Sequence, residues 1–544
     1  MEHDSYDAMP SFGEFCSDFF KRYFDLHPTE AIYYGIEGYD DQLDHYDDDA
    51  AGEKKTFVHE SLKQLRGFSV KRLTPDETID YALLEGRLIL EDYELNKEDQ
   101  RLKCPELYLP VSHIYILTVR PNKDMEGNIT SRLEQSPHLI NEGISNLSRP
   151  QSNPPQLWTK MAIQAAGGGL TFLENLPTTV KAKEGLRDPQ RFKTAVEKAS
   201  EAFERFREFL ESELLPRSRG SYAVGEEHYH LLLKKRHFLN HDAHTLLALG
   251  EKLFHRTKKE LAALADEIAP GKNIQEVTRN IQENHPPAGE ILQTYQKAME
   301  AARDFVMEQK LVSFPPHEEL RVVPTPEFRR HEIPFAAYLS PSPTDPKQIG
   351  YYYVTPMTDD DLLREHNRTG LENTCVHESY PGHHLQFTTA NAIPQASTLP
   401  RLMNESSVFY EGWALYCEQL MQETGFLKSK EHRFIMLKDR LWRALRIIID
   451  VKTQAGKMSY GEAADLMVRE LRFPRAQAES DLNWYSQSPS VPMGYALGWS
   501  IINRLRRQEK EKLGGQFDLC RFHDRLLSAG SISLPLVEKR HFSP

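Results

Sequence analysis

The chain has 544 residues, 39% of them hydrophobic and 27% charged, which is an ordinary composition for a globular protein with a large core. The formal net charge of -13 and the absence of a concentrated basic segment exclude a typical nucleic-acid-binding protein. No run of eighteen apolar residues could span a bilayer, and the first residues lack the basic and apolar parts of a secretory signal.

Helical periodicity dominates the chain. Within 197–215, Phe203, Phe206, Leu210 and Leu214 recur at three- and four-residue spacing, as on the buried face of a helix. The same pattern predicts further helices at 246–268, 290–309, 405–423, 432–453, 460–471 and 495–512. We therefore expect a mainly α-helical fold.

Two unusual segments in the N-terminal half have ordinary explanations. The acidic segment 40–49 is typical of a solvated loop or a helix start, and a metal site there is the less favoured interpretation. The triplet 167–169 consists of glycines but lacks the strand, spacing and lysine of a phosphate-binding loop. We expect it to be a helix boundary or a point of tight packing.

A proline-rich region between residues 311 and 359 interrupts the helical pattern. The short runs 320–323, 335–338 and 351–354 have the β-branched and aromatic character of strands. They predict a small antiparallel sheet ahead of the segment that contains His377. An edge of this sheet could pair with an extended peptide, and the alternative is a buried structural ribbon.

Three histidines and a glutamate lie within the stretch HESYPGHH, residues 377–384. In the common zinc motif HExxH, two histidines four residues apart share one helical face and reach one metal ion. Here that fourth position holds Pro381, which cannot bind a metal and interrupts a helix. On a regular helix His384 would lie about 10 Å along the axis from His377, too far for shared binding. A kink is required, and it leaves His383 and His384 as alternatives for the second ligand.

Nearby carboxylates complete the pattern of a zinc site. Glu378 follows the first histidine and is the expected general base. Glu411 and Glu418 are seven residues apart and share one face of the next predicted helix. Glu411 stands beside Gly412 and Trp413 in an apolar run, so it is the expected third ligand, and Glu418 is expected to orient an imidazole. The alternative is that these histidines cap helices and fill the core, and that the glutamates are solvated.

Two motifs resemble those of a known bacterial family, the domain of unknown function 885. They are HExxPGHHLQ, beginning at His377, and EGWALYxE, beginning at Glu411. Further likeness covers 443–450 and 492–498, and weaker similarity extends over about 15–536. That family is described as all-helical and metallopeptidase-like, so the resemblance implies a multi-lobed helical fold.

The family is similar in turn to helical oligopeptidases of the zinc-glutamate type, whose motif HExGH ends in a Gly-His pair. Gly382-His383 resembles that pair with two residues inserted. The resemblance therefore implies that His377, His383 and Glu411 hold one zinc ion, with manganese or cobalt as alternatives. His384 is then expected to contact the substrate or support a ligand.

The resemblance also implies a catalytic role for Tyr495. Its segment is similar to the Gly-Tyr-rich segment from which those enzymes supply a hydroxyl to the tetrahedral oxyanion, with Arg446 as a further candidate. A packed aromatic residue is the alternative. One position departs from the family, which commonly carries a histidine a few residues beyond the match to Asp450. Here Gln454 can donate a hydrogen bond but cannot act as an acid.

The expected protein is a zinc-dependent hydrolase of short peptides or peptide-like amides, with helical lobes in residues 1–310 and the sheet and catalytic region in 311–544. We expect no nucleic-acid or membrane partner. Five scattered cysteines without a CxxC pair favour reduced thiols and a cytoplasmic location. The alternatives are amide hydrolysis or acyl transfer on a small metabolite, and a non-catalytic helical scaffold.

Overall fold

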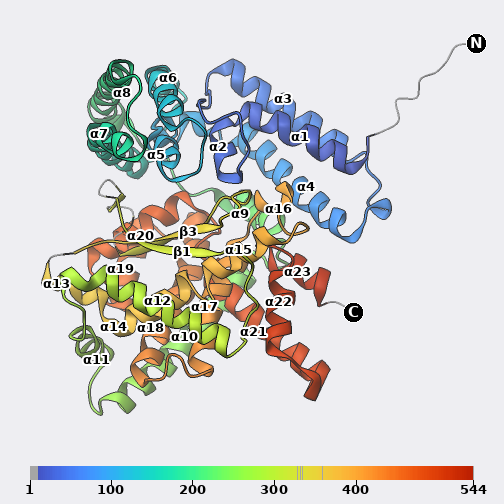
Figure 1. Ribbon diagram of the computed structural model, residues 1–544, viewed down its shortest axis with the longest axis vertical. Helices are drawn as coiled ribbons and strands as arrows, with labels where there is room; N and C mark the ends of the chain where they lie inside the picture. The colour runs from blue at the N-terminus through green and yellow to red at the C-terminus, as the bar shows by residue number, and fades with distance from the viewer. Residues whose placement is uncertain (1–9, 327–328, 331–332, 334, 358, 543–544) are drawn as a thin grey trace, which may run out of the picture. The chain divides into compact units, whose positions relative to one another are not determined.

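The chain folds into two compact units, Met1–Gly220 and Ser221–Pro544 (Figure 1). The computed structural model describes residues 10–326, 329–330, 333, 335–357 and 359–542. This division groups the helices between residues 225 and 308 with the C-terminal part of the chain, whereas the sequence predicts a boundary near residue 310.

The first unit is built from helices, because apolar residues recur at helical spacing along it. In α8, for example, the buried residues include Phe192, Ala195, Ala199, Phe203 and Phe206. The helix continues as a short π-helical stretch through 210–214, close to the predicted end. The helices are α1 (Phe12–Leu26), α2 (Pro28–Ala31), α3 (Asp48–Leu65), α4 (Pro75–Lys97), α5 (Val111–Val119), α6 (Met125–Leu147), α7 (Gln156–Glu184) and α8 (Pro189–Phe209).

The glycine triplet 167–169 lies inside α7 and not at a helix boundary. A Cβ atom on Gly169 would lie 2.6 Å from the ring of Phe203 and 2.8 Å from Val111. The triplet is therefore a point of tight packing against α8, which was one of the two expectations. The acidic segment 40–49 is a loop followed by the start of α3, as expected, and Asp47 caps that helix by accepting a hydrogen bond from the backbone N–H of Ala50.

The second unit is also mainly helical. Its helices are α9 (Gly225–Leu231), α10 (Ala243–Ile268), α11 (Ile274–Gln282), α12 (Ile291–Glu308), α13 (Asp360–Leu363), α14 (Arg368–Glu378), α15 (His383–Ala392), α16 (Leu399–Leu402), α17 (Ser407–Glu423), α18 (Lys430–Gln454), α19 (Tyr460–Leu471), α20 (Arg475–Gln487), α21 (Gly494–Leu513), α22 (Leu519–Leu527) and α23 (Leu534–His541). The most extensive contacts join α10 to α18 and α17 to α21. The helices predicted from periodicity are confirmed, and the one at 460–471 agrees at both ends.

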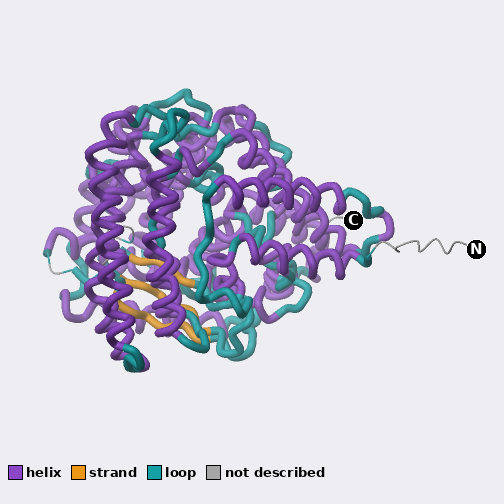
Figure 2. Tube along the Cα trace, turned by 90° about the horizontal axis from the view of Figure 1, so that it is seen from above, coloured by secondary structure: helices purple, strands orange, loops and turns teal. Residues whose placement is uncertain are grey.

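A three-stranded sheet interrupts the helices of this unit, at the place where strands are predicted (Figure 2). Its strands are β1 (Glu319–Pro324), β2 (Ala336–Leu339) and β3 (Ile349–Val354), in the order β1-β3-β2. The sheet is mixed and not antiparallel as expected: β2 pairs antiparallel with β3, but β1 pairs parallel with β3. Strand β2 runs opposite to the other two strands, so β1 and β3 run in the same direction, and they pair in parallel because β3 lies between β1 and β2.

The described helices include none that is long and apolar enough to cross a bilayer.

Candidate metal centre

The histidine-rich stretch contains a break between two helices. Helix α14 ends at Glu378 and α15 begins at His383, so the predicted kink is a complete interruption of four residues. The indole N–H of Trp413 donates a 2.8 Å hydrogen bond to the carbonyl oxygen of Pro381 and holds the connection in place. A Cβ atom on Gly382 would lie 1.9 Å from the carbonyl oxygen of His377, so the chain can turn back this tightly only with glycine.

The turn brings His377 and His383 together over Glu411. Oε2 of Glu411 lies 3.4 Å from Nε2 of His377 and 3.4 Å from Nε2 of His383. The two imidazole rings are 4.9 Å apart between centroids and nearly perpendicular, at 89°. All three side chains are buried, and their ligand atoms lie within 4.8 Å of one another. The structure thus brings together one imidazole before the break, one after it and one carboxylate.

Glu418 contacts His377 on the side of the imidazole that faces away from Glu411. Its Oε1 is 2.8 Å from Nδ1 of His377, the nitrogen that faces away from Glu411, as expected for a residue that orients an imidazole. Burial lowers the pKa of His377, but contacts with Glu411 and Glu418 outweigh it and raise that pKa to about 10. Burial raises the pKa of Glu411, but the close approach of the two histidines outweighs burial and lowers that pKa overall.

Glu378 is the last residue of α14 and is half-buried. Its side chain makes no hydrogen bond or ion pair with any other residue that the structure describes. Burial is the largest influence and raises the pKa of its carboxyl group, while the neighbouring charges of His377 and His383 act in the opposite direction. A carboxylate with no other partner beside the ligand group is available to exchange a proton there.

Tyr495 lies on α21 next to the ligand group. Its ring is 6.3 Å from that of His377 and nearly parallel to it, at 15°. Burial, followed by the charge of Glu411, raises the pKa of the Tyr495 hydroxyl well above its usual range. The hydroxyl therefore keeps its proton at neutral pH and is able to donate a hydrogen bond.

A buried guanidinium group covers the same tyrosine. Arg446 of α18 lies 4.5 Å from the ring centroid of Tyr495 and 4.1 Å from that of Trp442. Its Nε donates a 2.7 Å hydrogen bond to the hydroxyl of Tyr485. Its Nη1 is buried and has no hydrogen-bond partner among the described residues. The sequence indicated Arg446 and Tyr495. Trp442 lies one helical turn before Arg446 on α18, whereas Tyr485 belongs to α20 and left no local signal.

His384 lies outside the three-residue ligand group. It is fully buried, with Nδ1 3.1 Å from the hydroxyl of Tyr338 on β2 and Nε2 3.0 Å from Oε2 of Glu318. Glu318 also accepts hydrogen bonds from Nε and Nη2 of Arg303, at 3.0 and 2.8 Å. Tyr338 in turn stacks on His383, with ring centroids 6.3 Å apart. Glu318 and Arg303 escaped the sequence analysis because both stand in unrelated contexts, before β1 and on α12.

Gln454, at the position where the resemblance leads one to expect a histidine, is part of the packing of α18. Its Nε2 donates a 3.0 Å hydrogen bond to the carbonyl oxygen of Tyr485, and its Oε1 accepts one of 3.3 Å from the backbone N–H of Val224. Both ends of the amide are thus used for backbone groups, so Gln454 joins α18 to the segments around it.

The residues at the ligand group fit a divalent metal ion. Oε2 of Glu411 and Nδ1 of His383 are buried and make no hydrogen bond with any described residue. Four ligands around zinc at bond lengths near 2.05 Å lie about 3.3–3.4 Å from one another, and both Nε2-to-Oε2 distances are 3.4 Å. Two imidazoles and one carboxylate are also a donor set that zinc favours, with a further position left for water.

Comparison with known proteins extends the similarity over most of the chain. The sequence model of a family described as bacterial protein of unknown function (DUF885) matches residues 28–540. A search of curated proteins gave no significant match.

Two solved structures match the fold over nearly its full length. One is a "putative lipoprotein of unknown function" from Shewanella oneidensis, 25% identical, with a TM-score of 0.80 over 98% of this chain and 100% of that chain. The other is a "putative lipoprotein" from Colwellia psychrerythraea, 16% identical, with a TM-score of 0.85 over 98% of this chain and 99% of that chain.

A weaker likeness is to an M32 carboxypeptidase from Deinococcus radiodurans R1. It is 11% identical, with a TM-score of 0.41 over 98% of this chain and 96% of that chain.

The prediction of a cytoplasmic protein is wrong, because the two structures that match with TM-scores of 0.80 and 0.85 are described as putative lipoproteins. That prediction rested on cysteines without a pairing pattern. Cys375 and Cys417 are buried, and all five cysteines are free. Free thiols in a core follow from packing, so they carry no information about the compartment.

Proposed function

The chain belongs to DUF885, a family of bacterial proteins of unknown function, and we propose that it is a metal-dependent hydrolase of short peptides or peptide-like amides. The observation that carries the proposal is the position of Oε2 of Glu411, which is buried, makes no hydrogen bond with described residues and lies 3.4 Å from Nε2 of both His377 and His383. A metal ion bound there would supply a Lewis acid for the scissile carbonyl group and for a water molecule.

His377, His383 and Glu411 would hold the metal, and zinc is the ion that their donor atoms fit best. Glu418 would keep His377 in one orientation and one tautomer. Its carboxylate would accept a hydrogen bond from the Nδ1–H group, which leaves Nε2 free as a ligand. The connection between α14 and α15 would keep the two imidazoles in fixed positions relative to each other, because Trp413 donates a hydrogen bond to it.

Glu378 would act as the general base and then as the general acid. It would take a proton from the attacking water and return that proton to the nitrogen of the leaving amine. Its raised pKa supports the role of base, because a carboxylate that binds a proton more tightly than an ordinary glutamate accepts one from water at a lower cost in free energy.

Tyr495 would stabilise the tetrahedral intermediate by donating a hydrogen bond from its hydroxyl group to the oxyanion. Arg446 supports this assignment, because its cation lies 4.5 Å from the tyrosine ring and its Nη1 has no described partner. His384 would act at a distance, by orienting Tyr338 against His383.

The proposed substrate is a short extended chain. Strand β2 forms an edge of the sheet, and its Tyr338 stacks on His383, so an edge strand lies beside the ligand group. A peptide in extended conformation can pair with such an edge through its own backbone.

The test combines metal analysis with peptide profiling. Full-length protein purified without added metal would be assayed for zinc, and a peptide library would be screened for cleavage by mass spectrometry. We expect about one zinc ion per chain from this centre and a loss of turnover by a factor of about 10²–10⁴ in Glu378→Gln with zinc retained. The control is Glu511→Gln, an exposed residue of α21.

Full turnover in Glu378→Gln would remove this residue from the mechanism. A zinc-loaded protein that leaves the entire library intact would contradict the peptide substrate. The zinc content of His377→Ala and of His383→Ala should fall by one ion per chain, and an unchanged content in both variants would contradict the ligand set.

A further inference from the structure

A second group of two histidines and a glutamate lies in the first unit, formed by His45, His138 and Glu142. We propose that this group is a binding site for a divalent transition-metal ion such as zinc, separate from the centre at His377. The site would join the loop before α3 to the surface of helix α6.

The three ligand atoms have the spacing of a metal site. Oε1 of Glu142 lies 3.3 Å from Nδ1 of His45 and 3.1 Å from Nε2 of His138, and all three atoms lie within 4.8 Å of one another. Ligands around zinc are separated by about 3.3–3.4 Å. His138 and Glu142 are four residues apart on α6 and thus share one face, which is the spacing that lets two side chains of a helix reach one ion.

The same distances are long for direct ion pairs. A charge-assisted hydrogen bond between an imidazole and a carboxylate is about 2.7–2.9 Å. The contact between His377 and Glu418 has that length, at 2.8 Å. Nδ1 of His45 is within hydrogen-bond distance of Oε1 of Glu142, at 3.3 Å, and Nε2 of His138 lies 3.1 Å from the same oxygen, so the proposal rests on the convergence of three donor atoms at one point.

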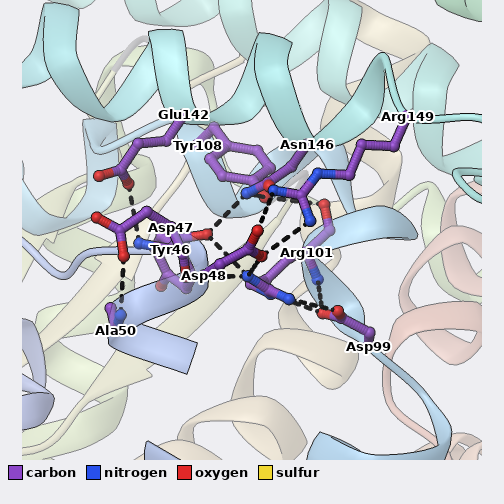
Figure 3. A network of polar contacts seen from close by, with 10 residues as sticks. All are labelled: Tyr46, Asp47, Asp48, Ala50, Asp99, Arg101, Tyr108, Glu142, Asn146 and Arg149. Carbon is purple, nitrogen blue, oxygen red and sulfur yellow. Dashed lines mark hydrogen bonds and ion pairs between the residues drawn. The ribbon is translucent and has the colours of Figure 1, made fainter. Parts of the chain in front are cut away.

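Glu142 is fixed in the orientation that a ligand needs. Its Oε2 accepts a 2.8 Å hydrogen bond from the backbone N–H of Tyr46, as Figure 3 shows, which leaves Oε1 for the ion. Its side chain is 5% exposed, whereas those of His45 and His138 are 56% and 65% exposed. A metal ion can therefore enter from solvent between two exposed imidazoles and reach the buried carboxylate.

The loop that contains His45 is held on both sides of that residue. The backbone N–H of Leu43 donates a 3.0 Å hydrogen bond to Oε1 of Gln135, and Nδ2 of Asn146 donates one of 2.7 Å to the carbonyl oxygen of Tyr46. Gln135 and Asn146 both belong to α6. Figure 3 shows the hydrogen bond from Asn146 to Tyr46 together with the ion pairs of Asp48, which lies just beyond the loop. Little chain entropy is lost when such a loop binds an ion.

The experiment is a zinc titration of metal-free full-length protein by calorimetry. If both metal centres exist, the protein takes up two equivalents, and His138→Ala and Glu142→Gln each lose one. Glu142→Gln should disturb the fold less than His138→Ala, because the amide oxygen can still accept the hydrogen bond from the backbone N–H of Tyr46. The amide nitrogen cannot bind zinc. Loss of a ligand should weaken this binding step by more than about 100-fold, the upper range for changes in supporting residues. The control is His59→Ala, an exposed histidine of α3.

A His377→Ala background separates this proposal from the hydrolase proposal. In that background one equivalent should remain, and His138→Ala should abolish it. Circular dichroism checks that each variant is folded. If His138→Ala and Glu142→Gln bind zinc with the stoichiometry and affinity of His59→Ala, the second site does not exist, whatever the outcome at His377.

Discussion

Gly412 and Gly498 lie in direct backbone contact where α17 crosses α21. A Cβ atom on Gly412 would lie 2.5 Å from the Cα atom of Gly498, and one on Gly498 would lie 1.8 Å from the carbonyl oxygen of Val408. Side chains larger than hydrogen would push the helices apart. Glu411 precedes the first glycine and Tyr495 stands near the second, so this crossing determines how closely the carboxylate and the phenol approach.

The first prediction concerns this crossing. Gly498→Ala should lower the free energy of unfolding by about 3 kcal/mol or more, because the new methyl group meets backbone atoms that cannot move aside. Urea unfolding followed by tryptophan fluorescence would measure the loss in the second unit, which contains Trp413, Trp442, Trp484 and Trp499.

The matched control for this change is Gly461→Ala in α19, where a Cβ atom would meet nothing within 4 Å. It should leave stability unchanged or raise it by up to about 1 kcal/mol, since alanine favours a helix. Equal stability of the two variants would show that α17 and α21 have room between them.

The second prediction concerns the residue behind His377. Glu418→Gln keeps the size of the side chain and an acceptor for Nδ1, but it removes the negative charge that strengthens the imidazole as a ligand. Zinc affinity at this centre should fall by about 10- to 100-fold, as measured by competition with a chelating dye. Glu423→Gln, an exposed position on the same helix, is the control. Unchanged affinity in Glu418→Gln would mean that the hydrogen bond serves packing alone.

The third prediction separates binding from catalysis at Tyr495. Tyr495→Phe preserves the ring that stacks on His377 and removes only the hydroxyl. If the hydroxyl stabilises the oxyanion, kcat should fall by about 10²–10³, while KM and zinc affinity stay near their original values. A change confined to KM would instead assign the hydroxyl to substrate binding, and unchanged kinetics would leave Tyr495 as a packed aromatic residue.

The fourth prediction concerns pH. Burial is the main cause that raises the pKa of Asp450 to about 7, against an ordinary value of 3.8, although Tyr229 and the backbone N–H of Ser490 donate hydrogen bonds to it. The folded protein therefore holds a proton that the unfolded chain releases, so the contribution of Asp450 to stability is greatest below about pH 4 and is lost as the pH rises to about 7. Three pKa units correspond to about 4 kcal/mol.

Asp450→Asn should remove this dependence, because an amide does not titrate. The difference in unfolding free energy between the variant and the original protein should rise in favour of the variant from pH 4 to 7 and stay constant above. Urea unfolding at a series of pH values would measure it. Parallel curves for the two proteins would show that Asp450 is ionised across this range.

Helix positions were largely determined by the sequence, because burial of one face imposes a three- and four-residue recurrence of apolar side chains. Helix α19 begins and ends where that recurrence predicts. Strand positions followed from aromatic and β-branched runs between prolines, but strand order did not, because the same runs allow either neighbour. Only the packed structure placed β3 between the other two and made the β1 pairing parallel.

The candidate metal centre was likewise indicated in part by the sequence and in part only by the tertiary structure. The residue types and the interruption by Pro381 were enough to indicate two histidines near one carboxylate, because a proline there prevents a continuous helix. Which imidazole faces His377 was left open by the spacing, and the resemblance alone favoured His383. The path of four residues between α14 and α15 brought His383 over Glu411 and turned His384 towards Glu318.

Contacts between distant segments were beyond any local pattern. His45 lies in a loop and Glu142 on a later helix, and a chain read in order gives no reason to join them. The spacing of apolar residues along a helix or strand shows which of its faces is buried, because residues at that spacing lie on the same face. The identity of the partner depends on how separate elements pack, and only the tertiary structure decides it.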